Sequence, residues 1–319
     1  MTTQEWAIED IEMVLQKAAE LKRNREITDD LKGKTFVMIF FNPSTRTRTS
    51  FTAAMVELGG YPMAVEADRI WLGQDSESPK DTAKVLSRYA SAIGVRIFPN
   101  ITKWKYGASH ELVRELAKWS DVPLINLEDD MYHPCQALSD IFTVREKKKK
   151  LTGKKFLLSW AYHPKPLPLS VPNSTLLMMT RFGLDVTLLH PPGFELDAKI
   201  IGMAQQNAAE SGGSFTIENK LEDGYRDADI VYVKSWSSLK SYGNPAEEKK
   251  LRLPYRGKWI CDEAKMDLTK KGSNFMHCLP LRRNVVATDG VVDGPRSIIY
   301  DQAENRLHVQ KAILLKLLK

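Results

Sequence analysis

Short apolar runs alternate with amphipathic segments along most of the chain, and this alternation limits the possible folds more than any other feature. Each run is long enough for one buried strand, and residues with helical spacing of apolar side chains separate it from the next. In the first half of the chain the runs lie at 35–40, 61–65, 92–98 and 122–126. A strand–helix alternation of this kind predicts a parallel sheet of the α/β class.

The alternation pauses at Leu151-Thr152-Gly153 and then starts again. Apolar runs of strand length follow at 156–160, 185–189, 229–233 and 258–261. A chain of 319 residues is long enough for two domains. We therefore predict an α/β protein with two doubly wound parallel-sheet domains, at 1–140 and 151–295. Helices are expected at 5–23 and at 302–319, and the second of these should pack back onto the first domain.

Hydroxyl and guanidinium groups gather where the first predicted strand passes into a helix. Residues 41–51 read Phe-Asn-Pro-Ser-Thr-Arg-Thr-Arg-Thr-Ser-Phe. The free backbone N–H groups and the dipole of a helix N-terminus favour an anion there. A serine cap before a solvated basic helix is the ordinary alternative, but Arg46 and Arg48 with four hydroxyl residues between 44 and 49 favour a site for phosphate or carboxylate.

Polar residues also follow the other predicted strands of the first half. Ligands of doubly wound sheets bind beyond the carboxyl ends of the strands. The residues expected at that edge are Ser44, Arg96, Asn126, His133 and Gln136.

Charge and composition exclude several classes of protein. The net charge of +6 could attract nucleic acid, but no stretch interleaves aromatic residues with Lys and Arg, so a small anionic substrate is favoured. Three cysteines are too few for a disulfide framework, and we see neither a leader nor an apolar run of about 18 residues. We expect a cytoplasmic protein without nucleic-acid or membrane partners. No glycine fingerprint follows 156–160 and no ligand cluster is evident, so neither a cofactor nor a metal is expected.

Three motifs in series resemble the aspartate/ornithine transcarbamylase superfamily. They are Ser-Thr-Arg-Thr-Arg at 44–48, His-Pro-Cys-Gln at 133–136 and His-Cys-Leu-Pro-Leu-Arg-Arg at 277–283. The resemblance covers essentially the whole chain. It implies two α/β domains with the active site in the cleft between them, assembled as a homotrimer in which a loop of the neighbour completes each site.

The resemblance also implies which residues bind carbamoyl phosphate. The phosphate group would be held by Ser44, Thr45, Arg46 and Thr47. The carbamoyl group would be contacted by Arg96, His133, Gln136, Arg306 and the backbone carbonyl of Leu279, with Trp71 supplied by the neighbour. Thr47, Arg96 and His133 would be catalytic, because they are donors suited to the oxygen on which negative charge grows. The group that takes the proton from the amine stays open among phosphate, His133 and Cys278.

The acceptor is indicated by Lys234-Ser235-Trp236. Ornithine transcarbamylases have an aspartate and Ser-Met-Gly in this region, which meet a free α-ammonium. A unit charge pair at about 4 Å is worth roughly 1–4 kcal/mol, so Lys234 would repel that ammonium and favour an acceptor with an acylated α-nitrogen. The resemblance to the N-acylornithine branch implies the acceptor residues Glu128, Asn173, Lys234, Cys278, Leu279 and Arg282.

The acyl group stays open at this point. Acetyl-type relatives carry a lysine where this chain has Val286, and residues 76–79 match neither the acetyl nor the succinyl type. N-Acetylornithine is favoured over N-succinylornithine, with ornithine third, and the product would serve arginine biosynthesis. Two hypotheses from other classes are a catalytically silent relative, which loss of the site residues would favour, and a nucleic-acid-binding protein.

Overall fold

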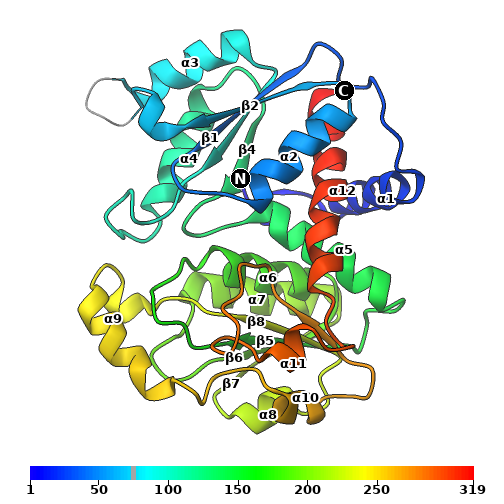
Figure 1. Cartoon of the computed structure of the whole chain (residues 1–319), viewed down its shortest axis with the longest axis vertical. Coiled ribbons are helices and arrows are strands. Elements are labelled where there is room, and N and C mark those ends of the chain that lie inside the picture. Colours follow the sequence, from blue (N-terminus) through cyan, green and yellow to red (C-terminus); the bar gives the residue numbers. More distant parts are fainter. Residues whose placement is uncertain (73–76) are drawn as a thin grey trace. The chain divides into compact units, whose positions relative to one another are not determined.

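The computed structural model describes residues 1–72 and 77–319, and its two parallel sheets confirm the predicted fold class (Figure 1). Unit 1 comprises Met1–Ser139 and Glu304–Lys319, and unit 2 comprises Asp140–Ala303. Each unit contains one sheet with helices between successive strands. All the strand pairings within the two sheets are parallel.

The sheet of unit 1 has the strand order β2-β1-β3-β4. Its strands are β1 (Thr35–Phe40), β2 (Tyr61–Glu66), β3 (Ala92–Arg96) and β4 (Leu124–Glu128). Within residues 1–72 and 77–139, five α-helices begin in this unit before the chain passes into unit 2 after Ser139. They are α1 (Ile8–Asn24), α2 (Arg46–Glu57), α3 (Pro79–Tyr89), α4 (Ala108–Trp119) and α5 (Pro134–Lys147). The last helix is α12 (Ile299–Leu318), most of which belongs to unit 1.

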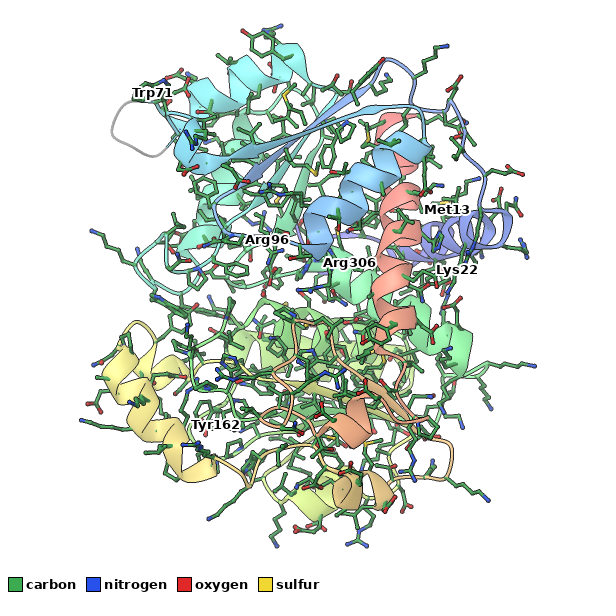
Figure 2. All side chains as sticks on the ribbon, in the orientation of Figure 1. Met13, Lys22, Trp71, Arg96, Tyr162 and Arg306 are labelled. Atoms are coloured by element: carbon green, nitrogen blue, oxygen red, sulfur yellow. The ribbon has the colours of Figure 1, made fainter. Side chains whose placement is uncertain are left out.

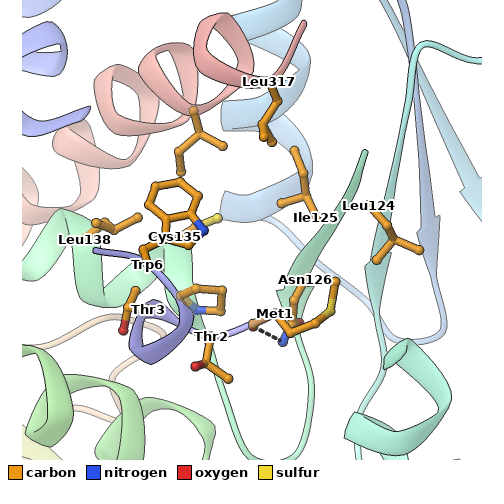
Figure 3. Close-up of a pocket in the computed structure, with 12 residues that line it drawn as sticks. Met1, Thr2, Thr3, Trp6, Leu124, Ile125, Asn126, Cys135, Leu138 and Leu317 are labelled. Carbon is orange, nitrogen blue, oxygen red and sulfur yellow. Dashed lines mark hydrogen bonds between the residues drawn. The ribbon is translucent and has the colours of Figure 1, made fainter. Parts of the chain in front are cut away.

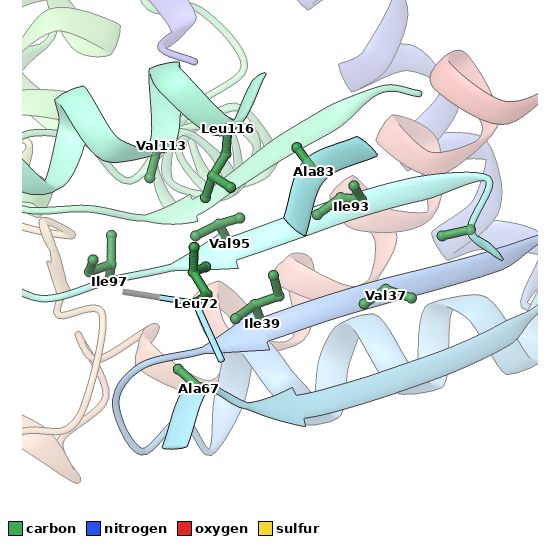
Figure 4. Close-up of a cluster of buried hydrophobic side chains, with 11 residues drawn as sticks. Val37, Ile39, Ala67, Leu72, Ala83, Ile93, Val95, Ile97, Val113 and Leu116 are labelled. Atoms are coloured by element: carbon green, nitrogen blue, oxygen red, sulfur yellow. The ribbon is translucent and has the colours of Figure 1, made fainter. Parts of the chain in front are cut away.

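Strand β1 is buried on both faces, as its unbroken apolar run predicts. On one face, Val37 and Ile39 pack in a cluster with side chains of β3, α3 and α4, including Val113 (Figure 4). Phe36 contacts Phe51 of α2, with ring centroids 5.3 Å apart. Burial of each large apolar side chain contributes about 1.5–3 kcal/mol, so β1 is fixed from two sides and its carboxyl end is placed firmly.

The sheet of unit 2 has the order β7-β6-β5-β8-β9. Its strands are β5 (Lys155–Trp160), β6 (Asp185–Leu189), β7 (Ser214–Glu218), β8 (Ile230–Lys234) and β9 (Asn274–Met276). Its helices are α6 (Ser170–Arg181), α7 (Ala198–Ser211), α8 (Leu221–Tyr225), α9 (Pro245–Arg252), α10 (Glu263–Asp267) and α11 (Asp289–Val292).

Three local expectations differ from the structure. The first helix begins at Ile8, because residues 3–5 form a separate 3-10 turn with a capping box from Thr2. Residues 258–261 form no strand and contribute only an isolated bridge between Cys261 and Ala287. The edge strand β7 was not predicted, since its side chains are mostly exposed and polar. Among the described residues, no helix is long and apolar enough to cross a membrane.

Candidate functional site

The chain reverses its winding direction between β1 and β3 in unit 1, and such switch points are where doubly wound sheets bind ligands. Phe40 and Arg96 are register partners at the ends of these strands. The Arg96 Nη1 donates to the Ser44 Oγ at 2.8 Å and to the Thr47 Oγ1 at 3.2 Å. The two predicted hydroxyl residues are therefore brought together with Arg96, which is labelled in Figure 2.

A second arginine reaches the same hydroxyl from the other end of the chain. The Arg306 Nη2 donates to the Thr47 Oγ1 at 2.9 Å, and its Nη1 donates to the Gln136 Oε1 at 2.7 Å. Thr47 is 1% exposed and Arg306 is 2% exposed. Two guanidinium groups thus converge at the N-terminus of α2, where the helix dipole adds further positive potential. This combination is suited to a phosphate-sized anion.

A buried carboxylate balances part of that charge. The Glu128 Oε2 forms an ion pair with the Arg96 Nη2 at 3.0 Å, and the His133 Nε2 lies 3.6 Å from the same oxygen. The sequence assigned Glu128 to the acceptor only through resemblance. The structure places it at the end of β4 against Arg96 and His133, two residues expected to contact the carbamoyl group.

The remaining predicted residues of this unit differ in exposure. Ser44 and Arg46 are half-buried and Thr45 is exposed at the start of α2. Arg48, suggested by the sequence as another anion donor, instead forms an ion pair with Glu66 of β2 and stacks 4.6 Å from the centroid of the Phe40 ring.

Trp71 is 70% exposed (Figure 2). The sequence comparison with the acetyl and succinyl types used residues 76–79. Of these, Ser76 lies outside the described residues.

Unit 2 has its own switch point, between β5 and β8. Trp160 and Lys234 are register partners at the carboxyl ends of these strands. The Trp160 Nε1 donates to the Trp236 carbonyl at 3.0 Å, and the Trp236 Nε1 donates to the Phe194 carbonyl at 2.9 Å. The buried Trp236 therefore anchors the loop after β8, and Lys234, which is half-buried, is held at the ligand-binding edge of the sheet.

Positive charges gather around His163 at this edge. Burial lowers the pKa of His163, and the nearby charges of Lys234, Arg252 and Arg282 lower it further. Lys234 and Arg282, both predicted to bind the acceptor, thus act on one imidazole. Arg282 also lines a pocket of about 270 Å³ with Tyr162, Pro164, Arg256, Gly257, Ile260, Asn284 and Val285. This edge is therefore suited to a ligand that carries carboxylate groups.

A buried ion pair that the sequence analysis missed supports both loops of this edge. The Glu248 carboxylate accepts from the backbone N–H of Ser238 and forms an ion pair with Arg252. The Arg252 Nη1 donates to the carbonyls of His163 at 2.6 Å and Lys165 at 3.0 Å. The sequence contains signals for the start of α9, since an asparagine cap, a proline and two glutamates precede its basic end. These signals did not indicate which residues the helix contacts.

The other predicted acceptor residues lie at two places in unit 2. Asn173 is buried in the first turn of α6. Leu279 follows β9 with a left-handed backbone (φ 56°) and a cis bond to Pro280, and its N–H donates to the His277 Nδ1 at 2.8 Å. The left-handed backbone is costly for leucine, and residues in this conformation cluster at functional sites. Cys278 is buried beside Tyr232, whose pKa is raised by burial, by Asp140 and by Cys278.

The cysteines are unpaired with one another, and all three are buried. Burial raises the pKa of Cys135 to about 11 and that of Cys261 to about 12. These two thiols therefore stay protonated near neutral pH and are poor nucleophiles. In the described part of the chain, no three His, Cys, Asp or Glu side chains are grouped to hold a metal ion.

Two doubly wound units, each with cationic groups at its switch point, define the class: an α/β protein suited to small anionic ligands. Comparison with known proteins identifies the family. Residues 1–146 match the carbamoyl-phosphate-binding domain of aspartate/ornithine carbamoyltransferases, and residues 169–317 match the Asp/Orn-binding domain. The chain belongs to the aspartate/ornithine carbamoyltransferase family.

Individual relatives cover nearly the whole chain. It is 44% identical to the N-acetylornithine carbamoyltransferase of Xanthomonas campestris pv. campestris over 99% of this chain and 96% of that protein. It is 40% identical to the ornithine carbamoyltransferase of Pyrococcus abyssi over 99% of this chain and 94% of that protein. A crystal structure of acetylornithine transcarbamylase complexed with acetylcitrulline superposes with a TM-score of 0.94, at 43% identity, covering 100% of this chain and 98% of that one.

Proposed function

We propose that this protein transfers the carbamoyl group of carbamoyl phosphate to the side-chain amine of N-acetylornithine, giving N-acetylcitrulline and phosphate. The observation that carries the proposal is the convergence of Arg96 and Arg306 on the buried Thr47 at the N-terminus of α2. Phosphate is bound by such helix starts, and the guanidinium groups supply charge-assisted donors. The relatives named N-acetylornithine carbamoyltransferase support the choice of acceptor.

The chemistry follows from these groups. The amine nitrogen forms a bond to the carbamoyl carbon, negative charge grows on the carbonyl oxygen, and the C–O bond to phosphate breaks. The departing phosphate takes the proton that the amine loses. Thr47, Arg96 and His133 stabilise that oxygen as donors, and preorganised donors of this kind each contribute about 3–4 kcal/mol in other enzymes. Ser44, Thr45 and Arg46 hold the departing phosphate.

Lys234 selects the acceptor in this proposal. Its ammonium attracts the α-carboxylate of an N-acylated ornithine and repels a free α-ammonium, and Arg282 adds a second positive charge near it. Asn173, Cys278 and the carbonyl of Leu279 complete the contacts, and Glu128 orients Arg96 and His133.

The assembly and setting belong to the same proposal. We infer a homotrimer in which the exposed Trp71 serves a neighbouring subunit's site, and a role in arginine biosynthesis in the cytoplasm. Mixing two inactive variants, Trp71→Ala and Arg96→Ala, should restore part of the activity, because some sites then receive an intact residue of each kind. No recovery after mixing and refolding would contradict the shared site.

The first experiment compares three acceptors with carbamoyl phosphate: N-acetylornithine, N-succinylornithine and ornithine. Turnover of N-acetylornithine is expected; turnover of N-succinylornithine or ornithine alone would replace the proposed acceptor, and turnover of none would contradict the proposed function. The Lys234→Asp variant should lose most activity with N-acetylornithine and lose least with ornithine. Its matched control is Lys240→Asp, because Lys240 is exposed in the same segment. Equal losses for both acceptors would remove Lys234 as the specificity residue.

A further inference from the structure

Two adjacent carboxylates, Asp129 and Asp130, follow β4 and are both 0% exposed. Neither is among the residues proposed to contact substrate. Burying a carboxylate is costly unless hydrogen bonds or opposite charges compensate for the lost water. The hydrogen-bond partners of each carboxylate therefore show which part of the structure it stabilises. Asp129 and Asp130 have different partners.

The Asp129 carboxylate uses both oxygens fully. Its Oδ1 accepts from the backbone N–H groups of Met131 at 2.8 Å and Tyr132 at 2.6 Å. Its Oδ2 accepts from the Asn126 Nδ2 at 2.7 Å and bonds the His110 Nδ1 at 2.6 Å. Four hydrogen bonds match the acceptor capacity of an ionised carboxylate, so Asp129 is a charged and fully satisfied anchor.

Hydrogen bonding also indicates which tautomer His110 adopts. The Arg114 Nε donates to the His110 Nε2 at 2.9 Å. Because a guanidinium can only donate, the Nε2 carries the lone pair and the Nδ1 carries the hydrogen given to Asp129. Arg114 is itself paired with Glu5, and the His110 ring lies edge-on to Tyr132 with centroids 4.9 Å apart. An ordered series of donors from Arg114 through His110 thus ends on Asp129.

Asp129 closes the turn that places His133. Its backbone N–H donates to the Tyr132 carbonyl at 3.0 Å, so both its main chain and its side chain bind residues 131–132. His133 comes next, and its carbonyl accepts the N–H of Gln136 at 3.0 Å, which begins α5. The Asn126 amide that bonds Asp129 also donates to the Met1 carbonyl, beside a small, mainly apolar pocket (Figure 3).

We propose that Asp129 is a positioning residue for His133, and that His110 and Arg114 hold Asp129 in the charged, correctly oriented form. The catalytic consequence rests on the proposed function, in which His133 contacts the carbamoyl group. In Asp129→Asn, an NH2 group that can only donate takes the place of the oxygen that now accepts from His110 and Asn126. The His133 ring then loses its fixed position relative to Glu128, 3.6 Å away. Misplacement by about 1 Å costs about 100-fold in rate.

The test compares Asp129→Asn with Asp130→Asn. Asp130 is equally buried, but it accepts from the backbone N–H groups of Gly107 at 2.7 Å and His110 at 3.1 Å, and so caps α4 rather than the turn before His133. We expect Asp129→Asn to lower kcat about 10- to 100-fold with a smaller change in KM. The kcat of Asp130→Asn should stay within about threefold of the value for the unaltered protein, because this substitution does not displace His133. Equal losses in both variants would overturn the proposal.

A double-mutant cycle separates positioning from general damage. In a His133→Asn background, Asp129→Asn should lower the remaining rate by less than about twofold, because residues that act through one another are not additive. The same fold-loss in both backgrounds would mean that Asp129 only supports the fold.

A structural readout keeps the proposal testable even where turnover is absent. The crystal structure of Asp129→Asn should show the His133 ring displaced from Glu128, whereas Asp130→Asn should retain the 3.6 Å separation. An undisplaced ring in Asp129→Asn would overturn the positioning role. Failure of the unaltered protein to turn over any acceptor would instead contradict the proposed function alone.

Discussion

Thr47→Val is the sharpest perturbation of the proposed donor site, because it replaces a hydroxyl by a methyl group of nearly the same size. The Thr47 Oγ1 accepts from Arg96 at 3.2 Å and from Arg306 at 2.9 Å. A hydrogen bond to a charged group contributes about 1.5–3 kcal/mol. Both arginines keep another partner, Ser44 and Gln136 respectively. The combined loss should therefore be smaller than the sum of two such bonds, which is about 3–6 kcal/mol, and we expect about 2–3 kcal/mol.

That loss corresponds to a roughly 30- to 150-fold decrease in kcat/KM for carbamoyl phosphate. The assay is colorimetric detection of the ureido product at saturating acceptor, with thermal unfolding recorded to show that the variant is folded. The matched control is Thr49→Val, which removes the same group from the same helix. The Thr49 hydroxyl is exposed and donates to the carbonyls of Thr45 and Arg46 at the start of α2. A kcat/KM for Thr47→Val within about twofold of that control would refute the assignment, because lost charge-assisted hydrogen bonds should cost more.

Two further predictions concern stability. Burial and the charge of Asp129 raise the pKa of Asp130 to about 6. The protonated Asp130 therefore contributes its full stabilisation below the pKa of the unfolded state, and this contribution is lost as the pH rises through 6. The free energy of unfolding should fall by roughly 1–2 kcal/mol between pH 5 and 7.5 because of this group. Urea unfolding should show that fall in the unaltered protein and a flatter profile in Asp130→Asn, and identical profiles would contradict it. Glu248→Gln leaves Arg252 as an uncompensated buried charge and should destabilise the protein by about 3–5 kcal/mol. The exposed Glu247→Gln should change stability by less than about 0.5 kcal/mol, and similar urea midpoints for the two variants would show that the buried pair is not needed.

The switch points explain why the sequence could predict which charged and hydroxyl residues lie at the carboxyl edge of each sheet. In a doubly wound sheet, the carboxyl ends of the two strands at the reversal lie side by side. Arg96 and Lys234 close buried strands, so their placement at this edge follows from the strand pattern alone. The hydroxyls of Ser44 and Thr47 follow β1 for the same reason, and the start of α2 supplies their positive field without any distant partner.

The sequence by itself thus determined the α/β class, the hydroxyl- and arginine-rich start of α2 and the positive charge at the carboxyl end of β8, because each depends on neighbouring residues and on strand or helix periodicity. Only the tertiary structure decided which groups complete the site. Arg306 reaches Thr47 from 259 residues away, Glu66 engages Arg48, and His110 and Arg114 hold Asp129. Such contacts are set by the packing of distant elements, where burial makes each unpaired charge costly and so selects its partner.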